Sequence, residues 1–187
     1  MENKDILNFI FELGQLRRIK HEGWRLIKVD HPESVADHSL RAAQIGFILA
    51  RLENYVNPYE VCSMVVFHDI GECRIGDIHK IGNRYLTVHE EQVVKDQTHS
   101  LDELGSLFLE LWKQVEYKST QAGVIAKDAD LLEQAFTAKE YLEIGYTYAQ
   151  DWITNIGNAL KTESAKRLLA ELHLSNSNNW WQGLKKL

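Results

Sequence analysis

A chain of 187 residues, 44% of them hydrophobic and 26% charged, has the size and composition of one globular domain and is too hydrophobic to be disordered. Its formal net charge of -6 argues against nucleic acid as a partner, because proteins that bind nucleic-acid backbones carry a basic surplus or stripe. The two cysteines, Cys62 and Cys73, are too few for a disulfide framework or a four-cysteine zinc site, and we expect both to be packing residues.

The first half of the chain alternates predicted helices with short connections. Apolar residues at steps of three and four predict an amphipathic helix over residues 5–19, and residues 24–29 predict an extended connection. Pro32-Glu33-Ser34 predicts the start of a second helix, with Ser34 as a candidate cap. Asn57-Pro58 predicts the start of a third helix, which we expect to reach Gly71 or slightly beyond.

The second half of the chain is also helical by its pattern. Residues 86–98 and 101–117 predict two helices, a long helix follows from about Thr120 to Tyr148, and a further apolar pattern continues through Leu172. The sequence contains no strand pair and no Asn-Gly hairpin turn. We therefore predict an all-α protein, an irregular helical bundle.

The sequence offers no sign of export or membrane insertion. The N-terminus lacks the basic start and apolar run of a signal peptide, and no stretch reaches the roughly 18 apolar residues that span a membrane. We expect a cytoplasmic protein with no membrane partner. We interpret residues 1–187 as a single domain, with core elements at about 5–150 and C-terminal helices and a tail at 151–187.

The most informative residues are His68 and Asp69, which are adjacent in an otherwise apolar predicted helix. Burying an imidazole and a carboxylate is costly unless each is paired or binds a metal ion. Alone, such a dipeptide is more often a hydrogen-bonded core pair than a metal site. Two further residues strengthen the metal interpretation: His38 is predicted on the inward face of the second helix, and Asp130 lies on the long later helix.

Taken together, the motifs resemble the HD superfamily of metal-dependent phosphohydrolases, whose order is a histidine, then an adjacent His-Asp, then a distant aspartate. Within it the chain is most similar to the small 5′-deoxynucleotidase and HD-domain-containing protein 2 group. The resemblance rests on these segments: Gly23-Trp24, Pro32-Glu33-Ser34-Val35-Ala36-Asp37-His38-Ser39, His68-Asp69-Ile70-Gly71-Glu72, Gly76-Asp77-Ile78 and Lys127-Asp128-Ala129-Asp130. The implied fold is the HD-domain helical bundle.

What the resemblance implies is one divalent cation with four protein ligands: His38, His68, Asp69 and Asp130. Two imidazoles and two carboxylates suit Mn²⁺, Co²⁺, Fe²⁺ or Zn²⁺. Asp128 and Asp130 point about 200° apart around a helix, so only one of them can face the ion. The family pattern selects Asp130, and we expect Asp128 to be solvated or to support a ligand.

The resemblance also implies catalytic roles for Glu72 and Asp77 and places Trp24 near a bound nucleoside; a core aromatic is the alternative for Trp24. This chain departs from the related deoxynucleotidases at a residue expected to bind the substrate phosphate. Where related deoxynucleotidases carry an arginine before the tryptophan, this chain has Gly23. We expect Arg18, then Lys80, to bind the phosphate instead.

The expected function is an enzyme that hydrolyses the phosphate ester of (deoxy)nucleoside 5′-monophosphates. The alternatives are a non-catalytic nucleotide-sensing module and a hydrolase of a triphosphate or cyclic nucleotide. Trp180-Trp181 near the C-terminus predicts a tail that docks on the body or forms a subunit interface, and we expect a homodimer. The remaining histidines that we assign to surface or packing positions are His31, His89, His99 and His173.

Overall fold

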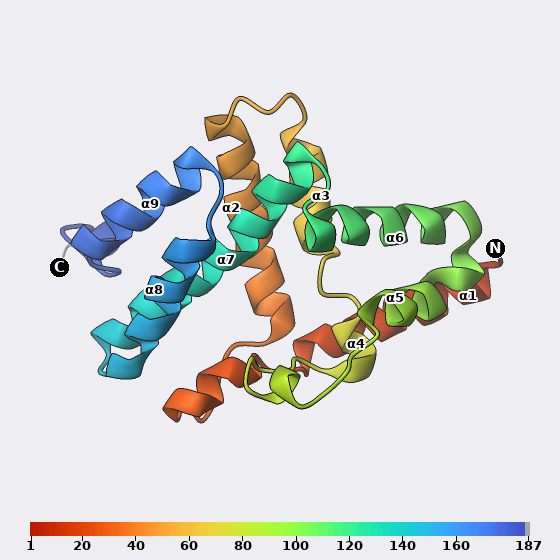
Figure 1. Ribbon diagram of the computed structural model, residues 1–187, viewed down its shortest axis with the longest axis horizontal. Coiled ribbons are helices and arrows are strands. Elements are labelled where there is room, and N and C mark those ends of the chain that lie inside the picture. Colours follow the sequence, from red (N-terminus) through yellow and green to blue (C-terminus); the bar gives the residue numbers. More distant parts are fainter. Residues whose placement is uncertain (186–187) are drawn as a thin grey trace.

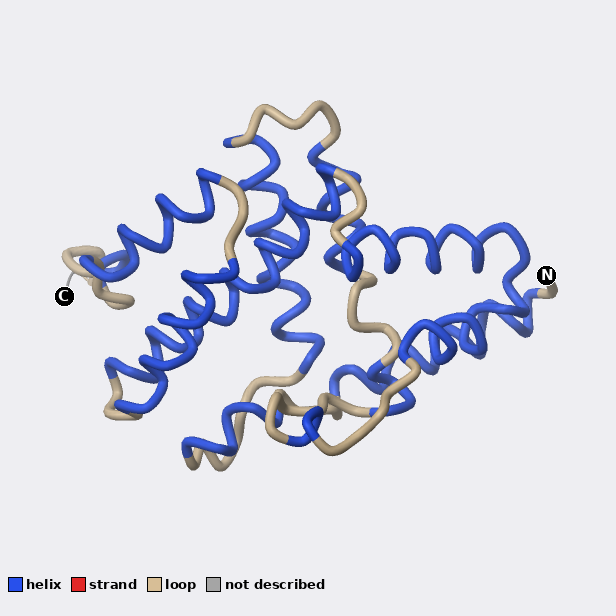
Figure 2. The backbone as a smooth tube through the Cα atoms, in the orientation of Figure 1, coloured by secondary structure: helices blue, strands red, loops and turns tan. Residues whose placement is uncertain are grey.

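The computed structural model describes residues 1–185, and within them it consists of helices and connecting loops without a strand, which confirms the all-α prediction (Figures 1 and 2). The α-helices of this part of the chain are α1 Asn3–Leu13, α2 Val35–Leu52, α3 Pro58–Val66, α4 Glu72–Ile75, α5 Glu90–Thr98, α6 Asp102–Tyr117, α7 Gln121–Glu143, α8 Gln150–Ala159 and α9 Glu163–Leu174. None of the helices within residues 1–185 is both long enough and apolar enough to cross a membrane.

The long helix α7 is the centre of the bundle. It packs against α2, α3, α6, α8 and α9, and Figure 1 shows α8 and α9 on one side of it and α6 on the other. Helices α2 and α3 approach closely at Gly46, where a Cβ atom would lie 3.2 Å from a methyl carbon of Val65. Because Gly46 has no side chain, α2 and α3 can pack closely. This close packing helps to bring His38 on α2 near His68 on the turn after α3.

A second, smaller group of buried side chains joins α1 to α5 and α6. Its members are Phe9, Ile70, Val94, Leu101, Phe108 and Trp112. The rings of Phe9 and Phe108 stack with centroids 5.1 Å apart. Ile70 is fully buried in this group and directly follows His68-Asp69 in the chain. This apolar anchor fixes the path of the chain just beyond the two polar residues.

The predicted third helix is interrupted at the most informative residues. Helix α3 ends at Val66 and α4 begins at Glu72, so His68 and Asp69 lie on a turn between two helices. In a continuous helix, neighbouring side chains point about 100° apart. The turn instead brings the His68 Nε2 atom to 3.0 Å from a carboxylate oxygen of Asp69. The interruption thus directs both side chains toward one point.

Other helix boundaries also differ from those predicted by the apolar periodicity. Residues 24–29 were expected to be extended, but Glu22–Ile27 form a 3-10 helix that ends at Lys28 with a left-handed φ of 69°. The long helix stops at Glu143 rather than Tyr148, because Gly145 takes a φ of 107° that breaks the helix. The expected cap at Ser34 is present, since its hydroxyl accepts a hydrogen bond from the Asp37 amide at 3.2 Å.

The C-terminal tail contacts the body through polar groups. Ser177 donates from its amide and hydroxyl to the Glu143 carboxylate at the end of α7. The tryptophans contribute little to this docking, because Trp180 is 77% exposed and Trp181 is 39% exposed. Of the two alternatives expected for the tail, docking on the body occurs through Ser177 rather than through burial of both indoles, and the subunit interface stays a prediction.

Asp128 has a structural role that differs from both roles expected for it. Its side chain is buried, not solvated, and it faces the connection between α8 and α9. Its carboxylate accepts hydrogen bonds from the Lys161 amide at 3.0 Å, from the Thr162 amide at 2.6 Å and from the Thr162 hydroxyl at 2.7 Å. Asp128 therefore ties the start of α9 to α7.

We predict that Asp128→Ala lowers the free energy of unfolding by about 2 kcal/mol or more, because it leaves buried backbone donors without a charged acceptor. Chemical denaturation monitored by circular dichroism measures this change. Glu171→Ala, at an exposed position on α9, is the matched control and should have no effect. A loss no larger than that of the control would show that the Asp128 contacts contribute nothing to stability.

Candidate metal centre

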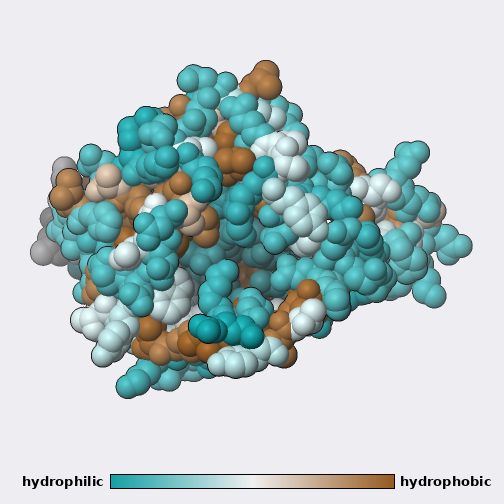
Figure 3. Space-filling view, in the orientation of Figure 1, coloured by the Kyte–Doolittle hydropathy of each residue, from teal (hydrophilic) through white to brown (hydrophobic). Residues whose placement is uncertain are grey.

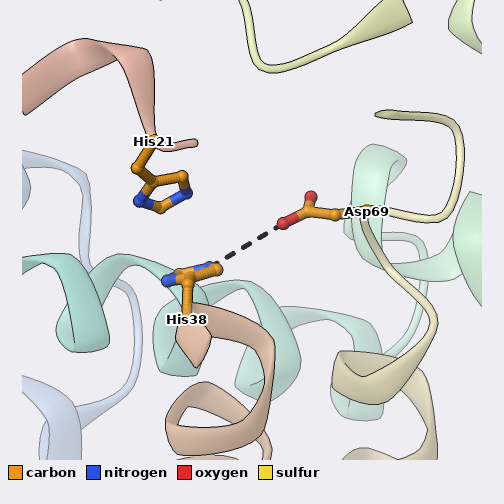
Figure 4. Close-up of side chains that lie close together, drawn as sticks. All are labelled: His21, His38 and Asp69. Atoms are coloured by element: carbon orange, nitrogen blue, oxygen red, sulfur yellow. Dashed lines mark ion pairs between the residues drawn. The ribbon is translucent and has the colours of Figure 1, made fainter. Parts of the chain in front are cut away.

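Three separate elements bring imidazoles and carboxylates to one buried point. His38 comes from α2, His68 and Asp69 from the turn after α3, and Asp130 from α7. One ligand atom each from His38, His68 and Asp130 lies within 4.8 Å of the others. The Nε2 atom of His38 is 3.3 Å from Asp130. It is 3.8 Å from Asp69, the pair joined by the dashed line in Figure 4. All four residues expected from the sequence thus meet.

Hydrogen bonds to the Nδ1 atoms of His38 and His68 set the orientation of the two imidazoles. His68 Nδ1 donates to the Val65 carbonyl at 2.7 Å, and His38 Nδ1 bonds the Glu133 carboxylate. Both Nε2 atoms are buried, and although carboxylate oxygens of Asp69 and Asp130 lie 3.0 to 3.8 Å away, neither nitrogen makes a well-aligned hydrogen bond within residues 1–185. A buried nitrogen without a partner is costly unless it faces a cation, and metal-bound histidines usually bond a carboxylate or carbonyl through the second nitrogen. The donor set therefore fits a divalent metal ion.

Glu133 is a functional residue that the sequence analysis did not identify. It is fully buried on α7, one turn after Asp130, and it accepts hydrogen bonds from His38, from Arg41 Nε at 2.8 Å and from the Thr137 hydroxyl at 3.0 Å. Although burial favours the neutral form, these donors hold the pKa of Glu133 below its usual value. A glutamate among alanines and leucines, three residues after Asp130, was the available signal.

Asp130 is also held by its neighbours. Lys127 Nζ lies 2.8 Å from one carboxylate oxygen, and the Gln134 amide donates to the other at 2.9 Å. Burial opposes ionisation, but Lys127 and the two histidines keep the pKa of Asp130 well below its usual value. Burial lowers the pKa of His68, but the carboxylates of Asp69 and Asp130 outweigh this effect and raise the pKa to about 10. The site therefore attracts positive charge strongly.

His21 brings a third imidazole to the same cluster. Its ring centroid is 4.4 Å from that of His38, and His21, His38 and Asp69 form a further group with metal-ligand geometry (Figure 4). The Nδ1 atom of His21 lies 3.5 Å from Glu33. Local sequence pattern does not single out His21, because its proximity to His38 depends on the path of the chain between them.

The cluster opens into a cleft of about 780 Å³, and Figure 3 shows this face of the molecule hollowed near its middle. Glu72 and Asp77 both line the cleft, as expected from the sequence. Burial, with the nearby Asp69 and Asp77, raises the pKa of Glu72 to about 10. Asp77 accepts a hydrogen bond from the Glu22 amide at 2.6 Å, which joins its loop to the segment that carries Trp24.

The structure does not bring every predicted substrate residue to the cleft. Lys80 lines it and is exposed. Arg18 lies outside the lining residues, and its guanidinium donates to the Gly14 carbonyl at 3.1 Å on the surface. The first helix ends at Leu13, earlier than the periodicity suggested, and Arg18 follows the 3-10 helix Gly14–Arg17. Trp24 borders the cleft but is only 1% exposed. The four histidines assigned to surface or packing positions are all exposed.

Comparison with known proteins agrees with this geometry. A family model described as HD domain matches residues 13–171. The 5′-deoxynucleotidase HDDC2 of Homo sapiens is 28% identical over 182 residues, covering 94% of this chain and 88% of that protein. A solved structure of a conserved hypothetical protein from Pyrococcus furiosus superimposes with a TM-score of 0.74 at 27% identity, covering 90% of this chain and 99% of that one.

A more distant structure shares the fold alone. The cyanophage S-2L HD phosphohydrolase DatZ, solved with dA and one catalytic Zn²⁺ ion, has a TM-score of 0.60 at 14% identity and covers 88% of this chain and 94% of its own. The match of the family model extends over most of the chain, and it confirms the resemblance seen in the motifs. This protein therefore belongs to the HD-domain family.

Proposed function

We propose that the protein is a metal-dependent phosphohydrolase that cleaves the phosphate ester of (deoxy)nucleoside 5′-monophosphates. The observation that carries the proposal is the pair of buried His38 and His68 Nε2 atoms, without hydrogen-bond partners in residues 1–185, facing two carboxylates at the floor of a cleft. The cleft volume lies in the range of small-molecule sites. Relatives covering most of the chain carry the name 5′-deoxynucleotidase, which supports the substrate class.

In this proposal, four residues hold one divalent ion: His38, His68, Asp69 and Asp130. The mixed nitrogen and oxygen donors favour Mn²⁺, Co²⁺, Fe²⁺ or Zn²⁺. Such an ion, when bound, lowers the pKa of a water molecule and polarises a phosphoryl oxygen. Glu133 fixes the tautomer of His38 by accepting from Nδ1, and Lys127 keeps one oxygen of Asp130 occupied.

Glu72 and Asp77 handle protons. Glu72 is mostly buried beside Asp69, and burial with Asp69 and Asp77 raises its pKa. A divalent cation held at the cluster would oppose this rise and favour the ionised carboxylate, which is the form that can take a proton from the attacking water. Asp77 has one oxygen bonded to the Glu22 amide, which orients the carboxylate toward the cleft where the leaving oxygen would lie. These two carboxylates disfavour the alternative of a non-catalytic sensing module, which has no need of them.

A phosphate release assay tests the proposed activity. The protein is incubated with nucleoside and deoxynucleoside mono-, tri- and cyclic phosphates, each with Mn²⁺, Co²⁺, Fe²⁺ or Zn²⁺ and with a chelator control. Release from 5′-monophosphates that requires the metal supports the proposal. Turnover of only triphosphates or cyclic nucleotides would favour those hydrolase alternatives. Binding of nucleotides without any turnover would favour the sensing module.

His68→Ala or Asp69→Ala should lose bound metal and turnover together, because each removes a donor from the ion. Elemental analysis of the purified variants, alongside the phosphate assay, measures both. Exposed His99→Ala is the control for a histidine outside the cluster and should retain both. Full metal content and activity in either site variant would remove that residue from the ligand set.

Glu72→Gln should retain the metal and lose roughly 10²–10⁴-fold in kcat, the usual effect of removing a positioned acid-base group. The amide keeps the size of the carboxyl group, so the cleft should stay intact. Elemental analysis and steady-state kinetics separate the two effects. An empty metal site in this variant would reassign Glu72 as a ligand.

Lys80→Ala should lower kcat/KM for a nucleoside monophosphate about 10-fold, because a charged hydrogen bond to phosphate contributes roughly 1.5–3 kcal/mol. Arg18→Ala is the matched control, since Arg18 is exposed and lies outside the cleft. Thermal unfolding checks that both variants fold. Loss of activity in Arg18→Ala with normal kinetics in Lys80→Ala would reverse this assignment and restore the arginine as the phosphate ligand.

Several finer expectations from the sequence stay predictions. These are the homodimer, the cytoplasmic location, the absence of a nucleic-acid partner and the single-domain organisation of residues 1–187. The homodimer prediction draws support from apolar side chains exposed near the C-terminus: Leu174, Trp180 and Leu184 are each at least 70% exposed.

A further inference from the structure

The tryptophan expected at the substrate has no free face. The Trp24 indole is 1% exposed, and its Nε1 atom donates to Glu33 at 3.3 Å. One face stacks on Trp152 with ring centroids 5.0 Å apart and planes tilted by 30°, and Tyr141 packs edge-on with a centroid distance of 5.2 Å. A base stacked on Trp24 would have to displace one of these rings.

Trp152 packs against Trp24 and borders the same cleft. It is carried by α8, it is half-buried, and it lines the same cleft as His68, Asp69 and Asp130. One face of the Trp152 indole packs on Trp24, which holds the ring in place. The largest aromatic surface available to a ligand in this part of the cleft therefore belongs to Trp152 rather than to Trp24.

Gly23 keeps the approach to Trp152 open. A Cβ atom built at Gly23 would lie 3.7 Å from Cζ2 of Trp152, so a side chain at this position would begin in van der Waals contact with the indole. This is the position where related deoxynucleotidases were expected to carry an arginine. Its replacement by glycine exposes a ring here instead of supplying a cation.

The rest of α8 suits a neutral ligand group better than a phosphate. Asn155 and Asp151 flank Trp152 on the same side, and both are exposed and line the cleft. The sequence of α8 contains no lysine or arginine, and the carboxylate of Asp151 would repel a phosphate. The amide of Asn155 offers both a donor and an acceptor, which match the edge of a heterocyclic base.

We infer that Trp152 is the stacking platform for the nucleobase and that Asn155 hydrogen-bonds the edge of that base. The inference rests on the proposed function, because it names the part of the nucleotide that α8 recognises. The phosphate then lies at the metal cluster and Lys80, and the base lies at the α8 wall. Stacking on an aromatic ring is tolerant of base identity, so the choice among bases falls to Asn155.

Two substrates with the same phosphate and sugar separate base binding from other effects. Trp152→Ala and Trp152→Phe are assayed with deoxyadenosine 5′-monophosphate and with deoxyribose 5-phosphate, which lacks the base. We expect Trp152→Ala to raise KM for the nucleotide roughly 10-fold and to leave kcat/KM for the sugar phosphate unchanged. Trp152→Phe retains a ring and should recover most of the loss. Trp180→Ala, in the exposed tail, is the control for losing an indole outside the cleft.

An equal fall for both substrates would overturn the inference, because it would mean that Trp152 acts only by packing against Trp24. An unchanged KM for the nucleotide would overturn it as well. Asn155→Ala, at an exposed position on α8, gives a second test: the ratio of kcat/KM between purine and pyrimidine monophosphates should change, and a constant ratio removes Asn155 from base recognition. Thermal unfolding checks that this variant folds. Failure of the proposed function itself is distinct, since the wild-type protein would then release no phosphate from any nucleotide in a metal-dependent way.

Discussion

The concentration of negative charge at one buried point is the constraint on which the rest of the structure depends. Asp69, Asp130 and Glu133 meet two imidazoles where α2, α7 and the turn after α3 converge. Removing charged groups from water is unfavourable unless other charges and hydrogen bonds compensate. Arg41 and Lys127 compensate at the edges of the cluster. The Nε2 atoms of His38 and His68, which make no hydrogen bond within the described residues, leave its centre suited to a divalent cation.

Helix α7 distributes its acidic residues according to helical geometry. Asp130 and Glu133 are three residues apart, so they share one face, and they respectively face the ion position and support His38. Asp128 points to another side and holds the start of α9. One helix therefore contributes a ligand, a residue that orients a ligand and a structural anchor.

The interruption between α3 and α4 matters as much as the helices. It directs His68 and Asp69 to the same point, while Ile70 buries itself in the small apolar group shared by α1, α5 and α6. Because α4 follows at once, Glu72 reaches the cleft beside Asp69. Interrupting the helix costs hydrogen bonds between backbone groups, and burial of Ile70 offsets part of this cost. In return, His68 and Asp69 point to the same place.

The sequence by itself determined the helical class and the Ser34 cap, because apolar periodicity and capping residues are written in the order of residues. The set of polar residues that meet was implied by the resemblance of its motifs to the HD superfamily. Only the tertiary structure decided which partners those residues have. Glu133 was overlooked because its contact with His38 joins residues 95 positions apart. Arg18 and Trp24 were assigned to substrate because sequence proximity does not reveal that one side chain turns to the surface and the other is covered by Trp152. Such contacts depend on where α1 ends and how α8 packs, and neither is set by local pattern.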